Sequence, residues 1–495
     1  MKALIAVVFL CLFTSLLIAR PMTPEDLWAM KRIGDMQVSP DGNWIAFELS
    51  EYDMEQNSGK TDIWLLSTQG GEPRQLTTNA HSSTAPRWKP DGLGIAFLSS
   101  RNGSEQIYFL SLKGGEAQQL TDLPVDVNDF IWSPDGDRFA FTAYVYPETK
   151  SLAETAEKDS AQKASKASAR IIDDLLFRHW NRWTDGKCTH VFACKTDGSN
   201  VIDLTPGNFD SPPLGLGGNQ DYVFSPNGEQ VAFVSNRTSM PAANTNNDLF
   251  VVPSTGGEAE CLTAENQAVD NQPLFSPDGN YLVYKAMQRP GFEADQYEIM
   301  LYDRQNGTAK SLTESLDLTP NEVIWAPDSK SLYFNVEEKG RVTIYSVAIK
   351  DDNITKLVEE NVNSNLQIHP DGKALYFKKQ SNQMPDEIFA LDLKSAKLQQ
   401  LTFVNKPLLD ELDINPVEEF WFTSFDGKAA HGFLLKPPAF DPAKKYPLIY
   451  LIHGGPQGMW SDDFHYRWNI SMFASPGYVV AAVNFRGSKG YGQEW

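Results

Sequence analysis

The chain repeats one short pattern of polar and apolar positions seven times. Each copy begins with a polar turn related to Ser39-Pro40-Asp41-Gly42 and continues into a short alternating apolar stretch, as at Trp44 to Phe47. The turns lie at residues 39–42, 89–92, 133–136, 225–228, 276–279, 326–329 and 369–372. Such a turn has a local cause, because proline presets φ, aspartate bonds nearby backbone and glycine accepts positive φ. We therefore expect a turn and then a strand at each copy.

A second apolar run follows the first after a polar gap, as at Ile63 to Leu66, and many of these runs lead to a leucine-threonine pair such as Leu76-Thr77. Successive copies begin 43 to 51 residues apart, with one longer step of 92 residues. This spacing is typical of a four-stranded propeller blade. One blade cannot bury both faces of its sheet, so the units are expected to pack radially. The pattern predicts an all-β seven-bladed β-propeller over residues 21–412.

The longer step contains an insertion at about residues 146–187. Its first part, residues 152–170, is rich in alanine, lysine and glutamate, which predicts a solvated helix or a loop. Its second part, residues 171–183, is dense in aromatic and charged side chains. Two interpretations stay open for this second part. It lines whatever lies above the ring, or it forms a helix that packs on its own blade through Trp180 and Trp183.

The pattern changes near Pro416. A hairpin is predicted about Asp426-Gly427, and two continuous apolar strands follow at Leu448 to Ile452 and Val479 to Val483, with a helix-sized segment between them. Continuous apolar strands suit a sheet that is buried on both faces. Residues 413–495 therefore predict the beginning of a doubly wound sheet.

A turn with candidate chemistry follows the first of these strands. His453, Gly454 and Gly455 stand at its carboxyl end, where an α/β-hydrolase places backbone N–H groups beside its nucleophile. Glycine suits this position because no β-carbon blocks the approach. We expect these three residues to form an oxyanion loop, and a purely structural role for the His453 side chain stays equally open. The predicted fold is thus a seven-bladed propeller followed by the N-terminal part of an α/β-hydrolase domain.

With these features together, the chain resembles the prolyl oligopeptidase family of serine peptidases, and within it the secreted dipeptidyl-peptidase and acylaminoacyl-peptidase branches. The residues that carry the resemblance are the seven turns, Arg178 to Trp183, His453 to Pro456, and Asn484 to Gly492. The resemblance implies hydrolysis of short peptides by a Ser-Asp-His triad through an acyl-enzyme, with the propeller limiting access. It implies no cofactor and no metal.

The substrate-facing residues are expected in the insertion. We predict that Arg178, His179, Trp180 and Asp185 face the substrate, with acidic groups of the insertion available to hold a free peptide amine. Arg486 is expected to pair with a carboxylate, either under the active site or as a buried structural pair.

One feature of the family is missing from the sequence. No Gly-x-Ser-x-Gly elbow is present, and Ser488 in Gly487-Ser488-Lys489-Gly490 lacks the spacing. Residues 416–495 are also fewer than the roughly 200 that such a domain commonly needs. We therefore expect a chain that is truncated before the catalytic serine, inactive as it stands, and left with apolar strand faces open to association.

Charge and targeting signals narrow the function classes. The formal net charge is −21, and such an acidic surface repels nucleic acid and anionic lipid. Lys2 and the apolar run from Ala3 to Ala19 predict a signal peptide over residues 1–20, hence a secreted or periplasmic protein without a stable membrane span after cleavage. An uncleaved anchor helix is the alternative. Cys188 and Cys194 flank one predicted strand, too far apart for a disulfide.

A rival function from another class is a secreted or periplasmic propeller that binds protein partners without catalysis. The segment from Leu448 to Arg486 discriminates against it, because a binding propeller has no need of two buried strands and a His-Gly-Gly turn. The preferred peptide and the oligomeric state stay open.

Overall fold

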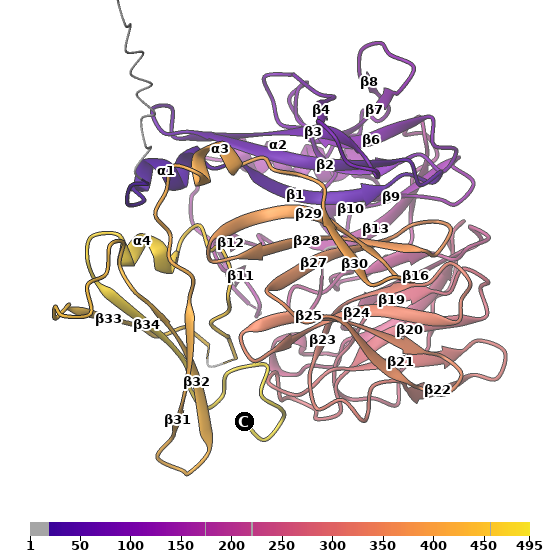
Figure 1. The fold of residues 1–495 in the computed structure, drawn as a ribbon. Helices are drawn as coiled ribbons and strands as arrows, with labels where there is room; N and C mark the ends of the chain where they lie inside the picture. Colours follow the sequence, from indigo (N-terminus) through magenta and orange to yellow (C-terminus); the bar gives the residue numbers. More distant parts are fainter. Residues whose placement is uncertain (1–18, 174, 219–220, 456) are drawn as a thin grey trace, which may run out of the picture.

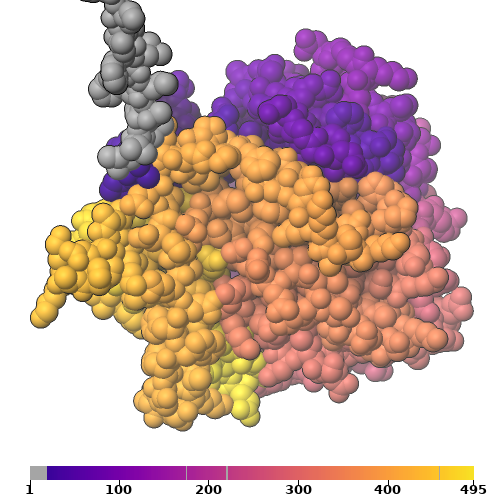
Figure 2. Space-filling model, viewed as in Figure 1, coloured from indigo at the N-terminus to yellow at the C-terminus, as the bar shows by residue number. Residues whose placement is uncertain are grey.

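The computed structural model describes residues 19–173, 175–218, 221–455 and 457–495. The predicted signal segment therefore lies, up to residue 18, outside the described residues, as does Pro456 of the His453 turn. Two parts are visible in Figure 1, a propeller of antiparallel sheets and a smaller sheet near the C-terminus beside one end of it. Figure 2 shows the second part as a lobe packed against the first.

The first three propeller sheets each contain four antiparallel strands. The first has β1 (Arg32–Val38), β2 (Trp44–Asp53), β3 (Ser58–Ser67) and β4 (Arg74–Gln75). The second has β5 (Thr84–Trp88), β6 (Gly94–Ser99), β7 (Gln106–Ser111) and β8 (Gln118–Gln119). The third has β9 (Asp129–Trp132), β10 (Arg138–Val145), β13 (Cys188–Lys195) and β14 (Ile202–Asp203).

The remaining propeller strands form two further four-stranded sheets and one eight-stranded sheet. One has β15 (Tyr222–Phe224), β16 (Gln230–Ser235), β17 (Asp248–Pro253) and β18 (Glu260–Cys261), with a short 3-10 helix at Pro241–Ala243. The next has β19 (Asp270–Phe275), β20 (Tyr281–Ala286), β21 (Glu298–Asp303) and β22 (Thr308–Ser311). The largest has β23 (Pro320–Trp325), β24 (Ser331–Glu338), β25 (Arg341–Ala348), β26 (Ile354–Val358), β27 (Val362–Ile368), β28 (Ala374–Ser381), β29 (Met384–Asp392) and β30 (Lys397–Gln400).

The strand predicted after each polar turn is confirmed as the second strand of a repeat, from β2 to β28. In the first turn the Ser39 hydroxyl donates to Asp41 at 2.5 Å, and the same carboxylate oxygen accepts the Asn43 N–H at 3.1 Å. Gly42 has φ +74°, which a β-carbon would disfavour. The turn chemistry is therefore the local one that the sequence predicted.

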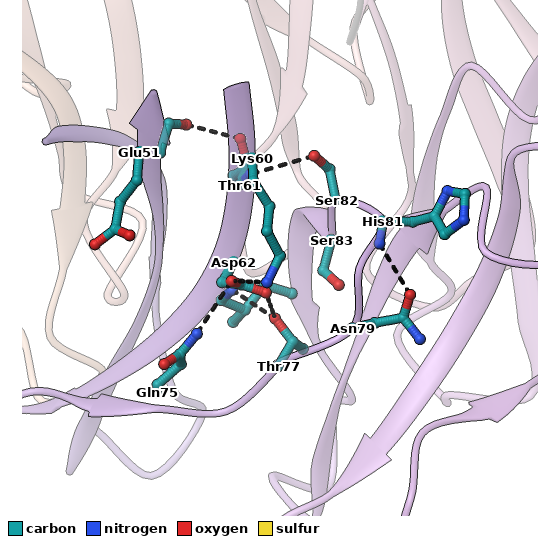
Figure 3. A network of polar contacts seen from close by, with 12 residues as sticks. Glu51, Lys60, Thr61, Asp62, Gln75, Thr77, Asn79, His81, Ser82 and Ser83 are labelled. Carbon is teal, nitrogen blue, oxygen red and sulfur yellow. Dashed lines mark hydrogen bonds and ion pairs between the residues drawn. The ribbon is translucent and has the colours of Figure 1, made fainter. Parts of the chain in front are cut away.

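The leucine-threonine pairs have a structural role that the sequence did not reveal. The Thr77 hydroxyl accepts the backbone N–H of Ile63 at 2.9 Å and donates to Asp62 at 2.9 Å, while Gln75 donates to the other oxygen of Asp62 (Figure 3). The same contact to the third strand recurs at Thr121, Thr205, Thr263, Thr313 and Thr402. Each hydroxyl satisfies a buried backbone donor that the short fourth strand leaves unpaired.

Side chains join the first and last repeats of the propeller. The Asn365 side chain donates to Asp35 at 3.0 Å and accepts the Met36 N–H at 2.9 Å. One apolar cluster also combines Phe47 of β2 with Ile388 of β29. Among the described residues, each repeat is built from strands of its own stretch of the chain, so the seam closes through side chains and no strand is exchanged across it.

The insertion contains helix α2 (Leu152–Ala164), capped by Ser151, and a two-stranded hairpin, β11 (Arg178–His179) and β12 (Arg182–Trp183). The interpretation of the second part as a helix packed on its blade is wrong. Arg178 pairs with Trp183 across the hairpin, and Trp180 is 84% exposed at its turn. The hairpin lies at the end of the propeller toward the C-terminal sheet (Figure 1).

The C-terminal sheet has the order β31 (Glu418–Thr423), β32 (Ala429–Leu435), β34 (Val479–Asn484) and β33 (Leu448–Leu451). The predicted hairpin and the parallel pairing of β33 with β34 are confirmed. The expected helix between them is short, α4 (Ile470–Ala474). β34 is buried, whereas β33 lies at the edge with Leu448 60% exposed.

Two short helices connect the parts. α1 (Pro24–Ala29) begins at a Thr23–Asp26 capping box, and α3 (Lys406–Leu409) follows the last propeller strand. Met30 and Leu412 share an apolar cluster with Phe464, so the N-terminal segment packs on the C-terminal part. Across the described ranges, every helix is too short or too polar to cross a membrane.

Candidate active site

The candidate site is the turn that follows β33. The His453 ring stacks on Phe485, with centroids 4.3 Å apart, and its Nε2 lies 2.8 Å from the Ser488 hydroxyl. Its Nδ1 lies 2.9 Å from the Gly454 carbonyl oxygen. The His453 ring is therefore fixed by three contacts, two of which come from the segment after β34.

The two described glycines of the turn have different roles. Gly455 has φ +129°, and a β-carbon there would lie 2.4 Å from the Gln457 nitrogen, so the turn requires glycine. A β-carbon at Gly454 would meet no atom within 4 Å. The Gly454 backbone thus presents an open face to which a substrate carbonyl can come close.

Asn484 holds the far end of the same loop. Its side chain accepts the Trp460 N–H at 2.7 Å and donates to the Trp460 carbonyl at 3.0 Å. It also donates to the Tyr491 hydroxyl at 2.8 Å. The backbone N–H of Lys489 donates to the Gly458 carbonyl at 3.0 Å. The segment from Asn484 to Gly492, which the sequence singled out only as a motif, is the support on which the loop rests.

The propeller holds the loop from the other side. The Asp462 carboxylate accepts hydrogen bonds from the Asn361 side chain at 2.7 Å and from the Asn382 N–H at 2.9 Å. The backbone N–H of Asp462 donates to the Gly340 carbonyl at 2.9 Å. Gly340 N–H contacts the Met459 sulfur at 3.2 Å. Turns of the eight-stranded sheet therefore fix residues 459–462, so the loop has supports on both parts of the molecule.

Two titratable groups lie behind the loop. Burial lowers the pKa of His431, whose Nδ1 lies 2.6 Å from the Tyr491 hydroxyl and whose Nε2 lies 3.5 Å from Glu419. Burial, with the negative charge of Asp462 and Asp386, raises the pKa of Asp463 to about 6. Among the described residues, neither His431 nor Asp463 forms a hydrogen bond with Gly454, so both belong to the support of the loop.

The carboxylate that pairs with Arg486 is that of Asp426, which lies in the β31–β32 turn at a distance of 2.9 Å. The two side chains are 28% and 27% exposed. The pair is therefore half-buried and ties this hairpin to the segment after β34. Ser488 is buried and its hydroxyl is hydrogen-bonded to His453, so we interpret Ser488 as a support for the loop.

The four residues predicted to face the substrate lie together on the insertion. Arg178 and His179 form β11, Trp180 is at the hairpin turn, and Asp185 pairs with Arg170 at 2.8 Å. Among the described residues, none of the four has a hydrogen bond or ion pair with the His453 turn. His179 lines a cavity of about 370 Å³. Arg182 and Asp210 line the same cavity, and the sequence did not identify these two residues.

Two of the cysteines lie on one strand of the propeller. Cys188 and Cys194 occupy opposite ends of β13, and burial raises the pKa of each thiol to about 12. Within the described ranges, no group of three or more His, Cys, Asp or Glu side chains is placed to hold a metal ion.

Comparisons with known proteins agree on the overall architecture. The model of the TolB beta propeller domain matches residues 34–170, and that of the prolyl oligopeptidase family matches residues 464–495. The chain is 30% identical over 480 residues to dipeptidyl-peptidase 5 of Porphyromonas gingivalis, covering 96% of this chain and 69% of that protein. It is 29% identical over 509 residues to dipeptidyl-peptidase 5 of Trichophyton equinum, covering 95% and 68%.

Solved structures show the same fold. An acylaminoacyl peptidase in complex with Z-Gly-Gly-Phe-chloromethyl ketone superposes with a TM-score of 0.76 at 20% identity, covering 95% of this chain and 68% of that one. An acylaminoacyl peptidase of Pyrococcus horikoshii superposes with a TM-score of 0.73 at 21% identity, covering 94% and 66%.

Proposed function

Since the chain belongs to the prolyl oligopeptidase family of peptidases, we propose that its function is that of a serine-type peptidase. Such an enzyme hydrolyses short peptides as a dipeptidyl-peptidase or an acylaminoacyl-peptidase does. The observation that carries this proposal is the His453 turn, held by Asn484, Phe485 and Ser488 with the Gly454 backbone open. The similarity to two dipeptidyl-peptidase 5 proteins supports the substrate class.

In this proposal the turn stabilises the oxyanion. When a serine hydroxyl attacks the scissile carbonyl, negative charge develops on the carbonyl oxygen, and fixed backbone N–H groups lower the barrier. The 495 residues contain no Gly-x-Ser-x-Gly elbow. The residues described here therefore supply the oxyanion side and the cap, while the attacking hydroxyl is not among them. His453 acts by holding the turn, since its Nε2 is occupied by Ser488.

The propeller limits access in this proposal. We count seven blades, because the eight-stranded sheet consists of two four-stranded meanders joined at one parallel bridge, Val342 to Val362. We also propose that the propeller ends at residue 412 and that the peptidase domain begins at residue 413. The residues proposed to face the substrate are Arg178, His179, Trp180 and Asp185. Export to a secreted or periplasmic location, which depends on residues 1–20, is also part of the proposal.

The test is an assay of the gene product that contains this chain. Dipeptidyl and N-acyl-aminoacyl p-nitroanilides are supplied separately, with and without a serine-directed phosphonate. We expect release of p-nitroaniline from at least one class and its loss with the phosphonate. No turnover of either class, or turnover that resists the phosphonate, contradicts the proposal.

A further inference from the structure

The C-terminal sheet contains a buried histidine that the proposed chemistry does not use. His431 lies in β32 and is 0% exposed. Its ring stacks on Trp421, with centroids 4.5 Å apart, and packs edge-on against Phe433 at 4.8 Å. A propeller turn also reaches it, because a β-carbon on Gly340 would lie 3.2 Å from the His431 ring. A polar ring that is enclosed in this way needs hydrogen-bond partners.

The Asn484 side chain sets the direction of the hydrogen bonds near this ring. Its oxygen lies 2.7 Å from the Trp460 backbone nitrogen, whose N–H can only donate. The two hydrogens of the Asn484 amide therefore go to the Trp460 carbonyl at 3.0 Å and to the Tyr491 hydroxyl at 2.8 Å. The Tyr491 oxygen thus accepts one hydrogen bond, and its own hydrogen is left to donate.

The acceptor for the Tyr491 hydrogen is His431, whose Nδ1 lies 2.6 Å from the Tyr491 hydroxyl. Since Tyr491 donates, Nδ1 carries no proton, and the ring proton is on Nε2, 3.5 Å from Glu419. A histidinium carries hydrogens on both nitrogens, so the Tyr491 hydroxyl would lose this acceptor. The hydrogen-bond relay from His431 through Tyr491 to Asn484 therefore requires a neutral histidine.

Charged groups from two other strands face His431. Glu419 of β31 lies near Nε2, and Arg341 of β25 forms an ion pair with the same Glu419 side chain. Burial lowers the pKa of His431, Glu419 raises it and Arg341 lowers it. Burial is the largest cause, so the pKa lies below 6.5 and the ring is neutral at pH 7. Burial also raises the pKa of Tyr491, whose hydroxyl therefore keeps its proton.

We propose that neutral His431 is a positioning residue for the oxyanion turn, acting through Tyr491 and Asn484. Asn484 holds both backbone groups of Trp460, whose ring lies edge-on to the His453 ring with centroids 6.3 Å apart. The relay thus places one wall of the turn from behind, and His431 itself is buried away from substrate. The expected effect on turnover rests on the proposed peptidase function, whereas the relay does not.

The first test reads the protonation state of the ring. Nitrogen-15 NMR of the histidine-labelled 495-residue chain at pH 7 distinguishes protonated from unprotonated ring nitrogens. The signals of His431 are those that disappear in His431→Asn. We expect an unprotonated Nδ1 and a protonated Nε2. A protonated Nδ1 at pH 7, in a neutral or a charged ring, overturns the proposal.

The second test measures whether the relay orders the loop. Tyr491→Phe removes the hydroxyl and His431→Leu removes its acceptor, so hydrogen exchange in residues 457–462 should become about tenfold faster in each. His431→Asn offers a side-chain oxygen near the position of Nδ1 and should restore most of the protection. The double variant should exchange no faster than the faster single variant, because both substitutions break the same relay.

The matched control for the exchange test is Tyr450→Phe, since Tyr450 in β33 is 51% exposed. It should leave the exchange of residues 457–462 unchanged. Unchanged exchange in Tyr491→Phe overturns the proposal, and this substitution keeps the test decisive if His431→Leu fails to fold. Additive effects in the double variant also overturn it, because they would mean that the two residues act separately.

The third test uses turnover by the gene product that contains this chain. Tyr491→Phe and His431→Leu should lower kcat by about tenfold with little change in KM, and His431→Asn should retain most of kcat. A change confined to KM overturns the positioning role, as does an equal loss in His431→Leu and His431→Asn at an unchanged melting temperature. If the parent protein cleaves neither class of peptide substrate, the proposed function fails, while NMR and hydrogen exchange still decide the relay.

Discussion

The propeller and the C-terminal sheet are stabilised in different ways. Each propeller repeat carries its own turn and buried strands, such as β6, in which all six residues are buried, and six of the repeats carry the threonine contact. The C-terminal sheet exposes alternate side chains of β33 at its edge, and Ile452 after it is 69% exposed. Its functional loop depends instead on contacts from β34 and from propeller turns.

This difference separates a scaffold from a site. A repeat in the propeller is stable because local sequence and neighbouring repeats supply the same contacts each time. The His453 turn is positioned by residues that are far away in sequence. We therefore expect mutations in the propeller to change global stability, and mutations around the turn to change local order and activity.

The largest expected effect comes from truncating one leucine in each region. Leu332→Ala in β24 removes a fully buried side chain and should cost about 2–5 kcal/mol of unfolding free energy. Leu448→Ala in β33 removes one that is 60% exposed and should cost about 0.5 kcal/mol or less. Urea denaturation measures both. Equal costs would show that the two regions do not differ in this way.

The second effect concerns the docking of the loop on the propeller. Asp462→Ala removes the acceptor for the Asn361 side chain and the Asn382 N–H and should cost about 1–3 kcal/mol. Hydrogen exchange should speed up in residues 457–466 while β6 stays protected. The control is Asp410→Ala, whose side chain is 60% exposed in its pair with Lys406. Unchanged exchange in Asp462→Ala would contradict the docking role.

A third and smaller effect tests the repeated threonine contact. Thr77→Val keeps the shape but leaves the Ile63 N–H without its acceptor, so it should cost about 1–2 kcal/mol. The neighbouring Thr78→Val is an exposed control that should change little. Thermal unfolding compares the two variants. Equal melting temperatures would mean that the hydroxyl contributes nothing to the sheet.

The smallest effect is a pH dependence near the loop. Burial raises the pKa of Asp463 to about 6 in the folded chain, from 3.8. Between these two pH values the folded state binds more protons than the unfolded state. The protonated Asp463 carboxyl therefore stabilises the folded chain fully below pH 3.8, and this stabilisation is lost as the pH rises through 6. Asp463→Asn should flatten this slope, and Asp441→Asn should not. Parallel slopes in urea titrations would contradict the assignment.

Local features of the fold could be predicted from the sequence. The turn at Ser39 to Gly42 and the strand after it depend on neighbouring residues, so both are confirmed. The segment at 171–183 could not be decided, because its aromatic and charged residues fit a helix as well as the hairpin that forms.

Long-range contacts were beyond the sequence. His453 and Ser488 are 35 residues apart, and their contact needs the parallel pairing of β33 with β34. Arg182 and Asp210 line one cavity only because the hairpin folds over the third sheet. The seven turns indicated a propeller, but nothing in them showed that Asn365 meets Asp35 at the seam.

The most direct test of the account adds a methyl group to the open face of the turn. In the gene product that contains this chain, Gly454→Ala should lower kcat by about tenfold or more with little change in KM, because the transition-state oxyanion loses its approach. Ala429→Val, at an exposed position of β32, should leave both constants unchanged. Equal kcat in Gly454→Ala and the parent protein would contradict the assignment of this turn as the oxyanion loop.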